Sequence, residues 1–154
     1  MNASIDAVRV AGTPEGPVPV VVLSFDDEPD VLPIFIGFDE ANSIAHGMDA
    51  YDIGRPLTHD LLLDVMEELG GRIERIEISE ISEEGTYIAD LHLQGPRQSM
   101  VVDARPSDSL ALAARTNAPI EVDEEVFEQG RQERAQFDEL ADIREMGELM
   151  GGEP

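Results

Sequence analysis

Two short segments of this chain repeat the same order of chemically reactive side chains. Residues 55–60 read Arg-Pro-Leu-Thr-His-Asp, and residues 103–108 read Asp-Ala-Arg-Pro-Ser-Asp. Each runs from an arginine and a proline through a Thr or Ser to an aspartate, and an apolar stretch with helical spacing follows. Because a helix N-terminus presents free N–H groups and favours negative charge, we expect a catalytic or anion-binding site where these two helices begin.

His59, Asp60 and Asp108 are the candidate catalytic residues of these segments. A histidine transfers protons near neutral pH or ligates a metal, but near a helix start it can also simply bond a backbone carbonyl. Asp60 and Asp108 occupy matching positions, and an aspartate there stabilises the helix dipole by about 0.3–1 kcal/mol without any chemistry. The sequence leaves the catalytic and the structural interpretation of these residues open.

Four carboxylates form a candidate ligand set for Mg²⁺ or Mn²⁺: Glu40, Asp60, Asp103 and Asp108. These cations take oxygen ligands, and nuclease sites often use them to activate water and to stabilise the leaving oxygen. The chain has no cysteine, which excludes disulfides and thiolate metal sites.

Arg55 and Arg105 are the candidate phosphate-binding residues, and the proline that follows each one favours an extended backbone. A guanidinium can hold a phosphate through two parallel hydrogen bonds. Each arginine could equally pair with a carboxylate such as Asp60 or Asp108, because ten arginines face 34 acidic residues. Arg115, at the end of the third helix, is expected to interact with the C-terminal end of the helix dipole.

The charge of the chain is extreme, with a formal net value of −24 at pH 7. All ten basic residues are arginine, and an acidic surface without lysine resembles that of proteins from extremely halophilic cells. At about 1 M salt the Debye length falls to about 3 Å, which screens self-repulsion and repulsion from nucleic acid. We therefore expect the protein to need salt for folding, and acidity alone does not exclude a nucleic-acid substrate.

The remaining composition favours a cytoplasmic protein with a packed core. Hydrophobic residues make up 42% of the 154 residues, which is enough for one domain. No stretch approaches the 18 consecutive apolar residues of a membrane span, and the N-terminus lacks the pattern of a signal peptide. We expect no membrane partner.

Hydrophobic periodicity divides the chain into strands and helices. Helices are expected from Asp39 to about Ala50, from Thr58 to Leu69 with its apolar side chains facing inward, from Ser107 to Arg115, and from Asp123 onward. Pro33 places its strand at an edge or a bulge, because proline cannot donate to a neighbouring strand. The segments expected as strands are 4–11, 18–25, 31–36, 72–79, 86–93, 99–103 and 119–122.

This order predicts an α+β fold with a mixed sheet of about six to seven strands and packed helices. The repeated segments suggest an internal duplication into two βββα-like halves. We expect one domain over residues 1–127 and an acidic, helical C-terminal tail over residues 128–154. The amphipathic tail and the surplus of apolar segments favour a homodimer or a higher homo-oligomer.

Four stretches together resemble the bifunctional nuclease domain family. They are residues 32–37 (Leu-Pro-Ile-Phe-Ile-Gly) with Glu40-Ala41 behind them, residues 55–61, residues 103–113 and residues 118–122. Their order and spacing agree with the family across about residues 8–127, and the tail lies outside the resemblance.

The resemblance implies a nuclease that acts on DNA, RNA or both, because plant members of the family are described in this way. In this interpretation the carboxylates and His59 hold an ion and water, and Arg55 and Arg105 steady the phosphate. Two alternatives stay open: a non-catalytic module that binds an anionic ligand or a partner, and a structural homo-oligomer whose repeated segments only lock helices onto a sheet.

Overall fold

The protein forms one mixed β-sheet with helices packed on it, in a computed structural model that describes residues 1–49 and 54–145. The strand order is β3-β2-β1-β7-β4-β5-β6, and β8 pairs with β1 beside this path. The strands are β1 (Asn2–Thr13), β2 (Gly16–Phe25), β3 (Glu28–Phe35), β4 (Arg72–Ile81), β5 (Tyr87–Gln94), β6 (Ser99–Ala104), β7 (Ile120–Val122) and β8 (Ala141–Asp142).

Each of the four predicted helices is present, although two of them begin earlier than expected and the last ends at Gly130 instead of continuing through the described part of the tail. The third starts at Pro106 with Arg105 as its N-cap, because proline suits the first helical position, where its missing N–H is not needed. The predicted residue Ala50 lies outside the described residues. The helices are α1 (Phe38–Asp49), α2 (Thr58–Glu68), α3 (Pro106–Thr116), α4 (Glu124–Gly130) and the 3₁₀ turn η1 (Arg134–Gln136).

The sheet consists of two antiparallel three-stranded units joined through β7. Strands β1, β2 and β3 form one unit, and β4, β5 and β6 form the other. The short β7 pairs antiparallel with β1 and parallel with β4, which makes the sheet mixed. The predicted α+β class is thereby confirmed, β3 with Pro33 is an edge strand, and internal duplication stays a prediction.

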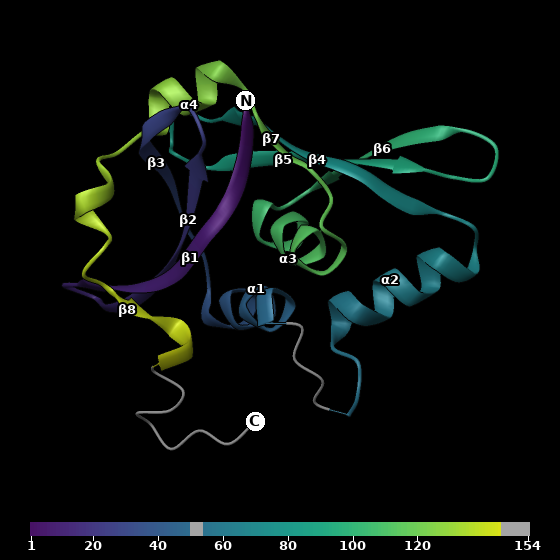
Figure 1. Cartoon of the computed structure of the whole chain (residues 1–154), viewed down its shortest axis with the longest axis horizontal. Helices are drawn as coiled ribbons and strands as arrows, with labels where there is room; N and C mark the ends of the chain where they lie inside the picture. The colour runs from purple at the N-terminus through teal and green to yellow at the C-terminus, as the bar shows by residue number, and fades with distance from the viewer. Residues whose placement is uncertain (50–53, 146–154) are drawn as a thin grey trace.

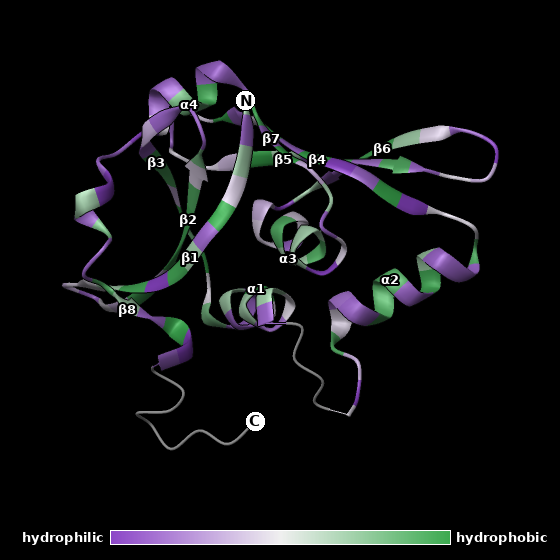
Figure 2. Ribbon diagram, in the orientation of Figure 1, coloured by the Kyte–Doolittle hydropathy of each residue, from purple (hydrophilic) through white to green (hydrophobic). Residues whose placement is uncertain are grey.

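The core lies between the sheet and the two helices α1 and α3. Figure 1 shows α3 between the two strand units, with α1 beside it. Leu110 and Leu112 of α3 are fully buried, as are Ile76 and Ile78 of β4 and Ile44 of α1. Figure 2 shows hydrophobic residues along the inner strands and on α3, and removal of this apolar surface from water favours their burial. The core therefore fixes α1 and α3 firmly in place.

Helix α2 departs from the prediction that its apolar side chains face inward. None of its 11 residues is buried, and only Leu63 packs against the main core. The prediction failed because helical spacing shows that one face is apolar without showing what covers it. The large side chains left exposed are Leu61, Leu62 and Val65, together with Leu69 just beyond the helix.

The C-terminal segment is described as far as residue 145. It contains α4, η1 and a helical turn at 143–145, and it also contains the short strand β8, which the sequence did not predict. Phe137 and Ile143 are buried, so this segment adds to the core. The boundary at residue 127 and the helical tail beyond residue 145 stay predictions, because residues 146–154 lie outside the described part. No helix in the described ranges is long and apolar enough to cross a membrane.

Substitution of Asp123 by Asn should alter how stability depends on pH. Partial burial, and then the hydrogen bond and the repulsion from Glu77, raise the pKa of Asp123 to about 6. The folded state therefore binds a proton that the unfolded state releases near pH 4, and stability falls as the pH rises between these values. Thermal unfolding of Asp123→Asn should show a smaller fall over this range and a higher midpoint than wild type at pH 8.

The control for this prediction is Asp26→Asn, in the exposed turn after β2. It should keep the pH dependence of the wild type. Equal slopes between pH 4 and pH 6 for wild type and Asp123→Asn would contradict the proposed sharing of a proton between Asp123 and Glu77.

Candidate functional site

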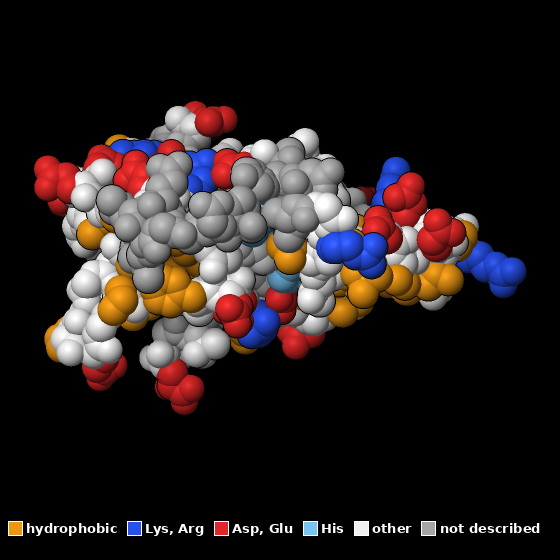
Figure 3. Space-filling model, turned by 90° about the horizontal axis from the view of Figure 1, so that it is seen from below, with side chains coloured by type: hydrophobic (Ala, Val, Ile, Leu, Met, Phe, Trp, Pro, Cys, Tyr) orange, Lys and Arg blue, Asp and Glu red, His pale blue; other side chains and the backbone are white. Residues whose placement is uncertain are grey.

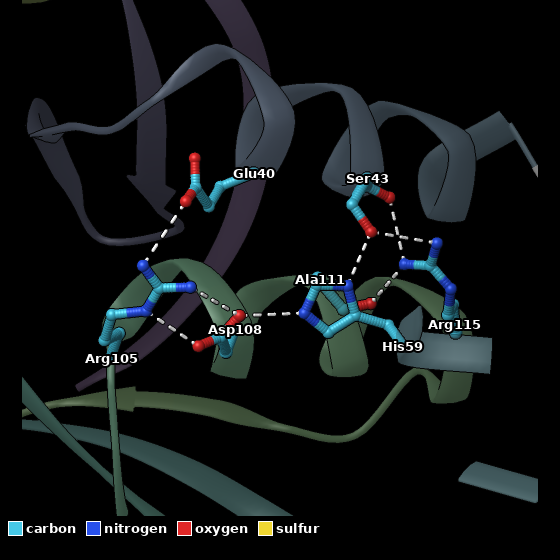
Figure 4. A network of polar contacts seen from close by, with 7 residues as sticks. All are labelled: Glu40, Ser43, His59, Arg105, Asp108, Ala111 and Arg115. Atoms are coloured by element: carbon cyan, nitrogen blue, oxygen red, sulfur yellow. Dashed lines mark hydrogen bonds and ion pairs between the residues drawn. The ribbon is translucent and has the colours of Figure 1, made fainter. Parts of the chain in front are cut away.

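A histidine of helix α2 contacts both of the neighbouring helices, α1 and α3. His59, in the first turn of α2, lies between Ser43 of α1 and Asp108 of α3 (Figure 4). Its Nδ1 is 2.6 Å from Ser43 Oγ, and its Nε2 is 2.9 Å from Asp108 Oδ1. The start of α2 is itself fixed by Asp60, whose Oδ2 accepts a hydrogen bond of 2.9 Å from the backbone N–H of Leu57.

The partners of Ser43 indicate how the protons of this network are arranged. Arg115 Nη2 donates to Ser43 Oγ over 3.2 Å, so the hydroxyl of Ser43 can direct its own proton to Nδ1 of His59. The neutral imidazole then carries its proton on Nε2 and donates it to Asp108. Ser43 therefore donates to one ring nitrogen of His59, and Asp108 accepts a hydrogen bond from the other.

Arg105 continues the network toward solvent. Its Nε donates to Asp108 Oδ2 over 2.9 Å, its Nη2 donates to Asp108 Oδ1 over 3.2 Å, and its Nη1 donates to Glu40 Oε1 over 3.3 Å. The Arg105 side chain is 64% exposed, whereas that of His59 is 14% exposed. An incoming ligand therefore meets the guanidinium first and the imidazole behind it.

The charges around Asp108 keep this carboxyl ionised. Burial acts to raise its pKa, but the hydrogen bonds from Arg105 and His59 outweigh burial and hold the pKa below its ordinary value. Asp60 follows the same pattern, since the backbone of Leu57 and the guanidinium of Arg115 outweigh its partial burial and lower its pKa. Both aspartates contribute stability above their unfolded pKa and lose it as the pH falls through their lowered, folded values.

Arg115 has a larger role than the helix-end interaction that the sequence predicted. Its side chain is only 7% exposed, and its Nε lies 2.6 Å from Asp60 Oδ1. Its Nη1 also donates to the backbone carbonyls of Ser43 and Ala111, each over 2.9 Å. Helix α1 comes close enough for these contacts because it has a glycine at position 47, where an added Cβ would lie 2.9 Å from Ala114 Cβ.

Two pockets open on either side of the His59–Asp108–Arg105 network. One, of about 630 Å³, lies toward the sheet, and its lining includes Leu62, Leu91 and Asp103 as well as the three network residues. The other, of about 390 Å³, lies toward α1, and its lining includes Asp39, Glu40, Ser43 and His46 with the same three residues. The network is therefore accessible from a mainly apolar pocket and from a polar, acidic one.

The structure brings together four of the seven predicted site residues. Glu40, His59, Arg105 and Asp108 form one connected set. Asp60 instead pairs with Arg115, and Asp103 lines the larger pocket from β6 without a bond to this set.

The remaining predicted residue, Arg55, lies apart from this set. It is exposed before α2, and it makes no hydrogen bond or ion pair with another described residue. The sequence did not identify Ser43, which no motif marks.

The predicted carboxylate ligands do not fit a preformed site for Mg²⁺ or Mn²⁺. Arg115 pairs with Asp60, and Arg105 pairs with both Glu40 and Asp108. Within residues 1–49 and 54–145, no group of three or more His, Cys, Asp or Glu side chains is placed to hold a metal ion. A metal requirement stays a prediction.

Sequence comparison identifies the family to which this fold and network belong. The sequence model of the bifunctional nuclease domain matches residues 21–135, which includes every residue of the network. The chain belongs to the bifunctional nuclease domain family. This agrees with the resemblance that the four sequence stretches indicated.

Relatives of this chain are known from bacteria and plants. Two proteins from strains of Mycobacterium tuberculosis, both described as uncharacterized, are each 40% identical to it over 111 residues. The match covers 72% of this chain and 65% of their length, so the chain spans about two thirds of these relatives. Bifunctional nuclease 2 of Oryza sativa subsp. japonica is 26% identical over 110 residues, which cover 69% of this chain and 34% of the rice protein.

Replacement of Arg115 by Ala should cost far more stability than loss of an exposed ion pair. The substitution leaves the carbonyl of Ser43 and the carboxylate of Asp60 without their buried donor, which should lower the free energy of unfolding by about 2–4 kcal/mol. Urea denaturation at constant, high KCl measures this change.

The matched control for Arg115 is Arg75→Ala, because Arg75 pairs with Glu121 on the surface, with side-chain exposures of 36% and 40%. Loss of that pair should lower the free energy of unfolding by less than about 1 kcal/mol. Equal losses in the two variants would show that Arg115 does not fasten the helices.

Proposed function

We propose that this protein is a nuclease whose active centre is the His59–Asp108–Arg105 network. The observation that carries the proposal is the position of this network, where an exposed guanidinium, a carboxylate and an imidazole meet between two pockets. Membership in the bifunctional nuclease domain family and the name of the rice relative support the choice of nucleic acid as substrate.

Arg105 is the group proposed to bind the phosphodiester. Its two hydrogen bonds to Asp108 form the fork that a phosphate group can also accept, so a phosphate can replace the carboxylate. Once Arg105 has turned to the phosphate, Asp108 loses the partner that lowers its pKa most, and its basicity rises. Substrate binding would thereby convert a paired carboxylate into a competent base.

Hydrolysis then needs one proton acceptor and one proton donor, and the Asp108–His59 pair can serve as both. A water oxygen forms a new bond to phosphorus while the bond from phosphorus to the leaving oxygen breaks. The proton of the water passes to the Asp108–His59 pair, and the same pair returns a proton to the leaving oxygen. Ser43 and Arg115 act as positioning residues, because Ser43 bonds the imidazole and Arg115 donates to Ser43, and neither contacts the phosphate.

Cleavage of labelled oligonucleotides tests this proposal. The purified chain in molar KCl, with Mg²⁺, with Mn²⁺ or with EDTA, is incubated with single-stranded DNA and RNA. His59→Gln should reduce the cleavage rate by roughly 10²–10⁴-fold, which is the usual contribution of a proton-transferring side chain. Activity in EDTA would show that the protein side chains suffice, and activity only with an added cation would establish the metal requirement.

The matched control is His92→Gln, in β5. His92 forms a similar pair with Glu77, at 3.0 Å and with 16% side-chain exposure, but it belongs to neither pocket that flanks the network. This variant should cleave as fast as wild type. Unchanged cleavage by His59→Gln would contradict the proposal and would point to a contaminating nuclease.

One observation favours a second candidate, a module that binds an anionic ligand without cleaving it. The lowered pKa of Asp108 in the unliganded site makes this carboxylate a weak base until Arg105 leaves it. A binding module would hold a phosphorothioate oligonucleotide through Arg105 and release no product. Binding lost in Arg105→Ala, together with no cleavage by wild type under any condition above, would decide for this candidate.

A further inference from the structure

One end of the molecule carries an apolar surface that the described chain leaves uncovered. We name the arm patch the exposed apolar residues of α2, of its C-cap and of edge strand β6: Leu61, Leu62, Val65, Leu69, Met100, Val101 and Val102. Within β6, Met100 and Val102 share one face of the sheet and Val101 lies on the other, so the patch extends around the sheet edge. Their exposed fractions range from 41% to 73%. Figure 3 shows a continuous line of hydrophobic side chains along the narrow end of the molecule, and Figure 2 places hydrophobic positions on α2 and β6.

The size of the patch indicates an interaction surface. Its seven residues expose roughly 600 Å², the upper end of the largest apolar patches on soluble monomers. Each partner in a standard protein interface buries about 800 Å² of surface. The arm patch together with its polar rim is large enough to provide this area. All seven side chains are aliphatic or Met, with no aromatic ring on which a base could stack, and this favours a protein partner over nucleic acid.

The two edge strands of the sheet differ in how far they are protected from pairing with another strand. Edge strand β3 contains Pro33, and a bridge between Val31 and Gln132 covers part of it. Edge strand β6 pairs only with β5 among the described strands, all of its residues except Ala104 are exposed, and it contains no proline. Proteins protect free edges with prolines, charges or covering segments, and the one charged residue of β6 is Asp103, next to its end. The apolar centre of this edge is therefore suited to pair with another strand.

We propose that the arm patch binds a second copy of this chain, with the two β6 strands paired antiparallel across a two-fold axis. A two-fold interface needs a surface that fits itself, and antiparallel pairing of a strand with its own copy meets this condition. The sheet then continues through both copies, and the apolar face of each α2 is covered by the partner.

The charges at the rim agree with this arrangement. Arg97, in the turn before β6, is exposed and has no ion pair with any described residue, in a chain where acids far outnumber arginines. Antiparallel pairing brings this turn beside the other end of the partner's β6, where Asp103 lies. The larger pocket at the network is lined by Asp103 and Leu62, so the second copy also forms an outer wall of that pocket.

Disulfide trapping tests both the interface and its register, because the chain has no cysteine of its own. Val101→Cys and Val102→Cys lie at the centre of β6, and opposite residues of an antiparallel pair are about 4.5–5.5 Å apart between Cα atoms, within reach of a disulfide. Oxidation of the full chain in molar KCl should join at least one of these variants to twice the 16.8 kDa mass of the chain. Intact-mass measurement under non-reducing conditions detects the product.

The matched control is Phe35→Cys, which is 55% exposed on the opposite edge strand and should not cross-link. In light scattering, wild type should have the mass of two chains, Met100→Asp combined with Val101→Asp should have the mass of one, and Phe35→Asp should remain dimeric. The circular dichroism spectrum should be unchanged in all three.

A wild-type mass of one chain up to high micromolar concentration would overturn the proposal. So would cross-linking of both valine variants no better than that of Phe35→Cys, or arm-patch variants that stay dimeric. None of these readouts depends on nuclease activity, so the proposed interface and the proposed function fail or stand separately.

Discussion

The hydrogen bonds of His59 determine both where α2 lies and what the site can do. Helix α2 buries none of its residues, so hydrophobic packing alone cannot fix its position. Polar contacts at its first turn supply the constraint, since His59 joins it to Ser43 and Asp108, and Asp60 joins it to Arg115. The core holds α1 and α3, and these three contacts fasten α2 to them. Any change that weakens these contacts therefore moves the imidazole of His59 away from the carboxylate of Asp108.

Arginine is scarce in this chain, and its arginines differ in whether they are buried for a structural role or exposed to a ligand. Arg115 is buried and makes four polar contacts, all with groups of α1, α2 and α3, so its role is structural. Arg105 is exposed, and its carboxylate partners can be exchanged for another anion. The acidic surroundings oppose a phosphate at low salt, but screening at molar salt leaves mainly the short-range contacts to decide binding.

Local patterns in the sequence were sufficient for most of the fold and for part of the site. The strands follow from alternating or continuous apolar runs, and the segment at 103–108 correctly located Arg105 and Asp108 at the start of α3. Ser43 and the multiple contacts of Arg115 were missed because they depend on the packing of α1 against α3, which no local pattern encodes. The exposed face of α2 and the pairing of β8 with β1 were missed for the same reason. The need for salt, the cytoplasmic location and the metal stay predictions.

The central claim is that Arg105 and His59 together meet a phosphodiester. Titration of the isotope-labelled protein with a non-cleavable phosphorothioate dinucleotide, followed by NMR of arginine Nε–H and histidine ring signals at molar KCl, tests it most directly. The signals of Arg105 and His59 should shift together and saturate, while those of Arg75 and His92 should stay unchanged. Shifts confined to other residues, or no shift of Arg105 at millimolar ligand, would contradict it.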